Sequence, residues 1–377
     1  MKRAASGVVR TRLRVLLGLV AVVALPHLAG CLPYHAGTLP EAPEATFLTL
    51  RGTSIRYVDE GPRDAPVVVL VHGFASSIGV WTGVREALRD RYRVLALDLK
   101  GFGHSGRPEG DYSPEEQARI VLALMDARSV HRAAFVAHSY GSSVALKVAL
   151  VAPERVERVA LYDAWVYAEQ LPTTFRWARA RGVGEMIFAG FYAERTEDKI
   201  ALAFHDPEII PQALVDDVEE QVRRPGTRAA ALASVRAMRF ETQQTHYREI
   251  EQPVLLLWGR EDAVTTLEVG ERLSNDLANA RLEIYPLCGH FPMIEAARPS
   301  TRDLLAFLQP GAATETSTAR STAPTPAQTA PAPQPDPTAD LGDGSNADPD
   351  TADPSDRTSD APANEPSDAG RNPWGTR

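Results

Sequence analysis

Short apolar runs alternate with amphipathic stretches through most of the chain. A continuous apolar run of about five residues is typical of a parallel strand covered on both faces, whereas apolar residues three and four apart indicate a helix. Eight strand-like segments fall at 47–51, 54–59, 67–71, 94–97, 133–137, 159–162, 254–258 and 282–285. Helix-like segments fall between them, at 84–91, 114–127, 142–151, 267–277 and 300–308. The alternation predicts an α/β fold, with a mostly parallel eight-stranded sheet and helices on both faces.

Residues 164–250 break this alternation because no segment among them has the pattern of a strand. Helical spacing is present at 175–191, 211–222 and 229–240. Since the region lies between two predicted strands, we expect an insertion that forms a helical cap over the active site. Its aromatic side chains are expected either to line an apolar pocket or to form the core of the cap itself. They are Phe175, Trp177, Phe188, Phe191, Tyr192, Phe204 and Phe240.

The two ends of the chain differ in composition from the body at 46–309. Residues 32–45 contain three prolines and little periodicity, so they are predicted to form a tether. Residues 310–377 are dominated by Ala, Pro, Thr, Ser and Asp, with Trp374 as their aromatic residue. A segment of this composition buries too little apolar surface to offset its ordering entropy, which predicts a disordered tail.

The distribution of charge excludes one class of partner. The chain of 377 residues carries a net charge of −9. Residues 311–377 hold 11 acidic and four Arg side chains, so −7 of that charge lies in the tail and −2 in the remainder. No basic stripe suited to nucleic acid is present in the body.

The first 31 residues have the layout of an export signal. Five basic and no acidic side chains precede an apolar run at 15–25, which is too short to span a bilayer comfortably. The run ends in Leu28-Ala29-Gly30-Cys31, which resembles the lipobox of bacterial lipoproteins. The resemblance implies acylation of Cys31 and attachment to a bacterial membrane outside the cytoplasm, with the outer membrane favoured because Leu32 rather than Asp follows. An uncleaved anchor or an ordinary secretory signal is the alternative.

The candidate nucleophile is Ser139. The strand predicted at 133–137 runs through Ala-His-Ser-Tyr-Gly into a helix, which places Ser139 on a tight turn at the sheet end, pointing toward a helix N-terminus. The five residues resemble the Gly-x-Ser-x-Gly elbow of α/β-hydrolases, with Ala137 in place of the first glycine. Such a turn needs small neighbours on both sides of the serine. A serine at a helix start is otherwise most often a cap.

The loop that follows the strand at 67–71 reads His72-Gly73-Phe74. In α/β-hydrolases this loop supplies one N–H group of the oxyanion hole, which the resemblance assigns to Phe74. The second N–H comes from the residue after the nucleophile, here Tyr140. Each donor of this kind stabilises a tetrahedral oxyanion by about 3 kcal/mol.

The candidate base is His290, in the sequence Cys-Gly-His-Phe-Pro between the last predicted strand and the last predicted helix. This resembles the Gly-His loop of the same family, including Glu295 and Pro299 downstream. The resemblance implies that His290 takes the proton from Ser139 and later returns it to the leaving group.

Two positions compete for the acid that orients His290. Asp262 follows the strand at 254–258, and the resulting order Ser, Asp, His is that of α/β-hydrolases, so Asp262 is favoured. Asp163 follows the preceding strand and is the alternative, a position that some relatives use. The other reading of Asp163 is a helix cap at the start of the insertion.

Other site classes find no support in the sequence. There is no Cys or His cluster at metal-ligand spacing, and the two cysteines, Cys31 and Cys288, allow no disulfide framework. A phosphate loop and a dinucleotide fingerprint are also missing, so neither a metal nor a cofactor is expected. The sequence from Asp98 to Ser105 resembles the family's Asp-x-x-Gly-x-Gly-x-Ser loop, whose role is structural.

These patterns predict a capped serine hydrolase acting on a small-molecule ester or acyl substrate through an acyl-enzyme. Carboxylesterase or lipase-like activity is the first expectation. Carbon–carbon bond hydrolysis, lactone hydrolysis or perhydrolysis on the same fold is the second, and a surface protein that only binds is the third. The natural substrate, acyl chain length and oligomeric state stay open.

Overall fold

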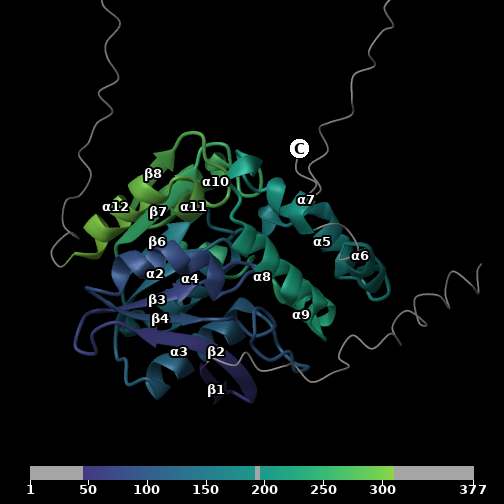
Figure 1. Ribbon diagram of the computed structural model, residues 1–377, viewed down its shortest axis with the longest axis horizontal. Helices are drawn as coiled ribbons and strands as arrows, with labels where there is room; N and C mark the ends of the chain where they lie inside the picture. The colour runs from purple at the N-terminus through teal and green to yellow at the C-terminus, as the bar shows by residue number, and fades with distance from the viewer. Residues whose placement is uncertain (1–45, 192–195, 310–377) are drawn as a thin grey trace, which may run out of the picture. The chain divides into compact units, whose positions relative to one another are not determined.

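A computed structural model describes residues 46–191 and 196–309, which form one eight-stranded sheet covered by helices (Figure 1). The strand order is β1-β2-β4-β3-β5-β6-β7-β8. The strands are β1 (Thr46–Leu50), β2 (Thr53–Glu60), β3 (Val67–Val71), β4 (Arg93–Leu97), β5 (Ala133–His138), β6 (Val156–Tyr162), β7 (Val254–Gly259) and β8 (Ala280–Tyr285). β1 and β2 pair antiparallel, as do β2 and β4, and all further pairs are parallel. The predicted fold class is confirmed.

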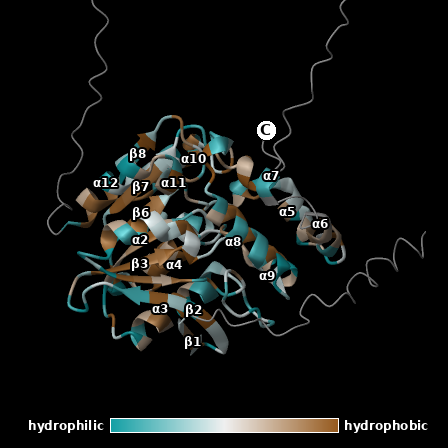
Figure 2. Cartoon of the chain, viewed as in Figure 1, coloured by the Kyte–Doolittle hydropathy of each residue, from teal (hydrophilic) through white to brown (hydrophobic). Residues whose placement is uncertain are grey.

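The central strands are apolar at every position because they separate two cores. In β3, Val69 and Val71 belong to one core, whereas Val68 and Leu70 belong to the other. Side chains of a strand alternate between the faces of the sheet, so burial on both faces demands an unbroken apolar run. Figure 2 shows the central strands coloured as hydrophobic along their length.

Helices cover both faces. The first core is closed by α3 (Pro114–Ala127), α4 (Tyr140–Val151) and α10 (Leu267–Asp276). The second is closed by α2 (Thr82–Leu88), α11 (Pro292–Glu295) and α12 (Ala297–Leu308). Short 3₁₀ turns are η1 (Ile78–Trp81), η2 (Pro153–Arg155), η3 (Ala168–Gln170), η4 (Pro207–Ile209) and η5 (Gln244–Glu249).

The insertion between β6 and β7 is helical, as predicted, and lies beside the sheet in Figure 1. Its helices are α5 (Thr173–Ala178), α6 (Val183–Phe191), α7 (Thr196–Ala201), α8 (Gln212–Arg223) and α9 (Thr227–Ala237). The prediction of one continuous helix over 175–191 was wrong, because the chain turns between α5 and α6. Gly182 sits in that turn with a φ of 81°, a left-handed conformation that glycine adopts without steric cost.

Several predictions fall outside the described residues. They are the signal peptide with Cys31, the tether at 32–45, the tail at 310–377 and the aromatic Tyr192. Within the ranges 46–191 and 196–309, none of the helices has both the length and the apolar character that crossing a bilayer requires.

Candidate active site

Ser139 occupies a strained turn between β5 and α4. Its φ of 49° and ψ of −122° lie outside the regions that side chains other than glycine ordinarily adopt. The turn is held on both sides, since Ser139 N–H donates to the carbonyl of Tyr162 (3.0 Å) and its carbonyl accepts from Trp165 N–H (3.0 Å). Strain that is fixed in this way is typical of a functional residue rather than of a simple helix cap.

The neighbours of Ser139 are small because backbone lies against them. A Cβ added at Gly141 would approach the carbonyl oxygen of Val71 to 2.4 Å, and one added at Gly73 would lie 3.1 Å from the Cβ of Ser139. Ala137, which replaces the first glycine of the family pattern, is fully buried and pairs with Val71 across the sheet. The structure therefore accommodates alanine at this position.

The loop after β3 comes close to Ser139 through Gly73, and this brings the next residue, Phe74, to the same end of the sheet. Within the described part of the chain, the backbone N–H groups of Phe74 and Tyr140 have no protein acceptor. Two backbone N–H groups without a protein acceptor are the donors that a developing oxyanion requires.

His72 holds the loop after β3, which contains Gly73 and Phe74, in place. Its Nε2 accepts from Leu99 N–H (2.9 Å), so its Nδ1 carries the proton that bonds the carbonyl of Gly73 (2.8 Å). Burial lowers the pKa of His72, which keeps the ring neutral and this tautomer in place. Asp98 supports the same region by accepting from the N–H groups of Ile78 and His104, in agreement with the structural role expected of its loop.

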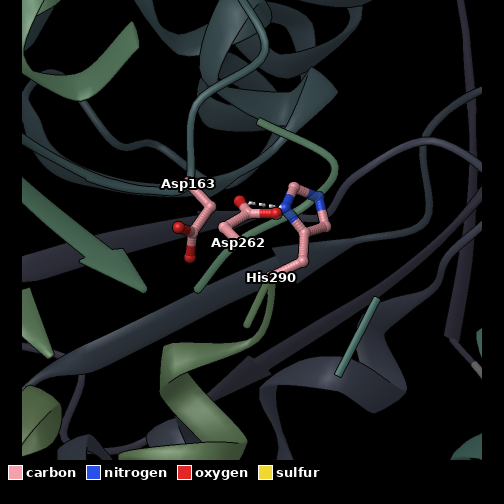
Figure 3. Close-up of side chains that lie close together, drawn as sticks. All are labelled: Asp163, Asp262 and His290. Carbon is pink, nitrogen blue, oxygen red and sulfur yellow. Dashed lines mark hydrogen bonds and ion pairs between the residues drawn. The ribbon is translucent and has the colours of Figure 1, made fainter. Parts of the chain in front are cut away.

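His290 and Asp262 form a buried pair. The Nδ1 atom of His290 lies 2.7 Å from Oδ2 of Asp262, and both side chains are almost fully buried. Figure 3 marks this interaction with a dashed line. Asp262 also accepts from Val264 N–H (2.7 Å), Thr265 N–H (3.1 Å) and the hydroxyl of Thr265 (2.7 Å). Four donors stabilise the charged form of this carboxylate and hold it in one orientation.

Asp163 lies next to the pair of Asp262 and His290. It follows β6 with a φ of 42°, and its Oδ1 accepts from Gly259 N–H (2.9 Å) at the end of β7. Asp163, Asp262 and His290 have ligand-type atoms within 4.8 Å of one another. Burial first, and then the charge of Asp262, raises the pKa of Asp163 well above its ordinary value, which favours the protonated form. The acid that is hydrogen-bonded to His290 is Asp262, and Asp163 contacts the end of β7 instead.

Asp163, Asp262 and His290 lie close enough together that they could in principle share a metal ion. Both oxygens of Asp262 are already used by four donors, and Nδ1 of His290 is one of those donors. A bound cation would have to replace these hydrogen bonds, so the geometry fits a carboxylate–histidine pair better than a metal site.

His138 braces the histidine loop from the sheet side. Its Nε2 lies 2.8 Å from the carbonyl oxygen of His290, and the two imidazole rings pack with centroids 4.7 Å apart. Burial lowers the pKa of His138 well below its ordinary value, with His290 as the next cause, so the ring stays neutral and donates through Nε2–H. The contact joins residues far apart in the chain, so no sequence spacing indicates it.

Glu295 ties the histidine loop to the cap. Its Oε1 accepts from Gly289 N–H (3.0 Å) and Phe291 N–H (3.2 Å), and its Oε2 accepts from His205 N–H (2.8 Å). The backbone N–H of His290 itself donates to the carbonyl of Ala203 in the cap (2.7 Å). The loop that carries His290 is therefore held jointly by the core and by the cap.

Three aromatic rings pack around Phe74 in the loop after β3. The ring centroid of Phe74 lies 5.3 Å from Phe102, 5.6 Å from Phe175 and 6.3 Å from Trp165. Phe175, Phe188 and Phe240 are buried in one core with Trp165, and Phe204 stacks on Phe291. Trp177 is instead 62% exposed, so the expectation that it lines a pocket or the cap's core was wrong.

Comparisons with known proteins identify the family. Residues 66–297 match the model of the alpha/beta hydrolase fold family, so the chain belongs to that family and is a hydrolase. It is 28% identical over 245 residues to the pimeloyl-[acyl-carrier protein] methyl ester esterase of Nitrosomonas europaea (61% of this chain, 91% of that protein). It is 27% identical over 290 residues to the 2-hydroxy-6-oxononadienedioate/2-hydroxy-6-oxononatrienedioate hydrolase of Paraburkholderia xenovorans (73% and 98%). Among solved structures, Cfl2 of Burkholderia cenocepacia superposes with a TM-score of 0.64 at 25% identity, covering 73% of this chain and all of that one.

Proposed function

We propose that this hydrolase is a carboxylesterase or lipase-like enzyme, with Ser139 as nucleophile, His290 as base and Asp262 as the orienting acid. The observation that carries the proposal is the 2.7 Å bond between His290 and Asp262, at the sheet end where Ser139 holds its strained φ of 49°. A serine after β5, an acid after β7 and a base after β8 form the arrangement that nucleophilic acyl transfer needs.

The proposed reaction uses Ser139, His290 and the backbone N–H groups of Phe74 and Tyr140. Ser139 Oγ attacks the acyl carbon while its proton passes to Nε2 of His290, and the N–H groups of Phe74 and Tyr140 bind the oxyanion. The imidazolium then protonates the leaving alkoxide, which releases an alcohol and leaves the acyl group on Ser139. Water, deprotonated by His290, attacks the acyl-enzyme, and collapse yields a carboxylic acid and the free serine. Asp262 stabilises the imidazolium and keeps the proton on Nδ1.

We also propose that the enzyme acts outside the cytoplasm, attached to a membrane through lipid on Cys31. The support is the order of basic residues, apolar run and Leu28-Ala29-Gly30-Cys31 in the first 31 residues.

A second candidate is hydrolysis of a carbon–carbon bond or a lactone. It is favoured by similarity to the Paraburkholderia xenovorans hydrolase, which extends over 73% of this chain and so includes cap as well as core. The same Ser139, His290 and Asp262 would serve it. Perhydrolysis would use peroxide in place of water at the acyl-enzyme and needs no further residue.

The test is hydrolysis of p-nitrophenyl esters from acetate to laurate by the chain that begins at residue 32. Ser139→Ala is expected to reduce the rate to background, whereas Ser142→Ala is expected to retain it. Ser142 is a matched control because it is a fully buried serine one helical turn away. Folded wild type that cleaves no ester would contradict the esterase proposal and favour the carbon–carbon or lactone substrate.

A further inference from the structure

Helix α6 is apolar on faces that the protein does not cover. Glu185 is its one charged residue, and a helix that is hydrophobic all round is ordinarily buried. One side is indeed packed, since Phe188 is fully buried and a Cβ at Gly184 would meet the carbonyl of Ala178 at 2.2 Å. On the other side Val183 is 37% exposed and Met186 is 51% exposed.

The charge of α6 faces inward. Both oxygens of Glu185 accept from the guanidinium of Arg236 on α9, each at 3.0 Å. Val183 and Met186 are three residues apart and so share one face of the helix. The exposed face of α6 therefore presents apolar side chains without an acidic group among them. Figure 2 shows α6 at the outer edge of the cap.

Trp177 lies on α5, the helix that precedes α6. Its carbonyl accepts from Ala180 N–H (3.0 Å), and the carbonyl of Ala180 accepts from Gly184 N–H (3.0 Å), so a tight turn joins the end of α5 to the start of α6. The indole of Trp177 is exposed. We use the name cap patch for Trp177, Val183 and Met186.

The border of the cap patch is basic. Arg176 and Arg181 are exposed on the same two-helix corner. Arg176 donates to the carbonyls of Glu169 and Leu171. Arg179 is half-buried and faces the carboxylate of Glu241 at 3.8 Å. Tryptophan and aliphatic side chains bordered by Arg are the composition of surfaces that insert into an anionic membrane interface.

We propose that the cap patch docks on an anionic lipid bilayer. The chain itself indicates this occupant, because Leu28-Ala29-Gly30-Cys31 resembles a lipid-attachment sequence and only residues 32–45 separate Cys31 from β1. Fourteen residues reach at most about 50 Å, so an acylated Cys31 would keep the domain at the membrane surface. Docking requires no hydrolytic step, but it rests on the proposed attachment to a membrane through Cys31.

The test measures tryptophan quenching by lipids with brominated acyl chains. The full chain is bound to phosphatidylcholine vesicles containing about one third phosphatidylglycerol. Trp177 is the tryptophan in the described ranges that is exposed, whereas Trp81, Trp165 and Trp258 are buried. Wild type is expected to be quenched and Trp177→Phe to lose at least half of that quenching, with weaker quenching of wild type on vesicles of phosphatidylcholine alone.

A matched pair of variants locates the contact. Met186→Glu is expected to reduce quenching of Trp177, whereas Val151→Glu at the end of α4 is expected to leave it unchanged. The two side chains are similarly exposed, at 51% and 54%, and both changes add one negative charge. Thermal unfolding followed by circular dichroism checks that both variants fold.

The Cys31→Ser chain separates failure of the anchor from failure of the patch. At saturating vesicle concentration it is expected to keep quenching that depends on Trp177. Equal quenching in wild type and Trp177→Phe would overturn the proposal. So would a dimer in lipid-free sedimentation that Met186→Glu dissociates, because the patch would then be covered by a second copy of the chain.

Discussion

The sheet and the cap use similar apolar side chains but are held together differently. Each central strand is paired along its length, and its residues fill two cores at once, as Val68 and Val69 do on successive positions of β3. The cap consists of helices of 6 to 12 residues, and one of them, α6, leaves an apolar face exposed. The sheet therefore fixes the strand ends that carry Ser139, Asp262 and His290, whereas the cap has a face that the protein leaves uncovered.

The two regions meet at the loop of His290. The sheet side supplies Asp262 and His138, and the cap side supplies the carbonyl of Ala203. Contacts from both sides allow the cap to influence the position of His290, which is the base in the proposed mechanism. Substitutions on the sheet side and on the cap side separate the two contributions to the position of His290.

The sheet side of the pair is tested by Asp262→Asn. An amide would favour the wrong tautomer of His290 and would not stabilise the imidazolium, so kcat is expected to fall by about 10⁴-fold. Steady-state ester hydrolysis measures it. A fall smaller than tenfold would mean that another group orients His290.

The difference in stability between the regions is tested by Phe135→Ala in β5 and Phe188→Ala in α6, since both rings are fully buried. In the sheet the change is expected to cost about 3–5 kcal/mol of the free energy of unfolding. In the cap it is expected to open the cap locally, raising KM and proteolysis within 164–250 more than it lowers global stability. Equal losses in denaturant unfolding would show that the cap unfolds together with the sheet.

The junction is tested by Glu295→Gln. The amide of glutamine has one acceptor oxygen, whereas Glu295 uses two to accept from three N–H groups. The hydrogen bond from His205, or those from Gly289 and Phe291, is therefore weakened. We expect kcat to fall about tenfold. Glu261→Gln is the control, because Glu261 accepts from Cys288 N–H (3.0 Å) in the same loop. Identical effects of the two changes on kcat and KM would argue that the link to the cap contributes nothing.

The smallest effect on rate is expected for Asp163→Asn, since an amide resembles the protonated acid. The effect on stability depends on pH. Between about pH 4 and the raised pKa of Asp163, the folded state holds a proton that the unfolded state has lost, so the wild type loses stability as pH rises. The variant is expected to match the wild type near pH 4 and to exceed it progressively above that. A variant that is less stable at every pH would contradict a neutral Asp163.

The sequence was sufficient where one local rule determines the structure. Apolar runs gave the parallel strands, and the order of Ser139, Asp262 and His290 indicated groups that the fold brings to one end of the sheet. It was insufficient where tertiary contacts decide. The break between α5 and α6 depends on Gly182, and the exposure of Trp177 depends on what the cap leaves uncovered. The hydrogen bond that His205 N–H donates to Glu295 joins residues far apart in the chain, which no spacing predicts.

The central claim is that Ser139 is the nucleophile, and covalent trapping tests it most directly. A fluorophosphonate reacts with an activated serine by displacing fluoride, and peptide mass spectrometry identifies the modified residue. We expect one label on Ser139 in the wild type and none in Ser139→Ala. Folded wild type that stays unlabelled, or a label that persists in the variant, would contradict the account.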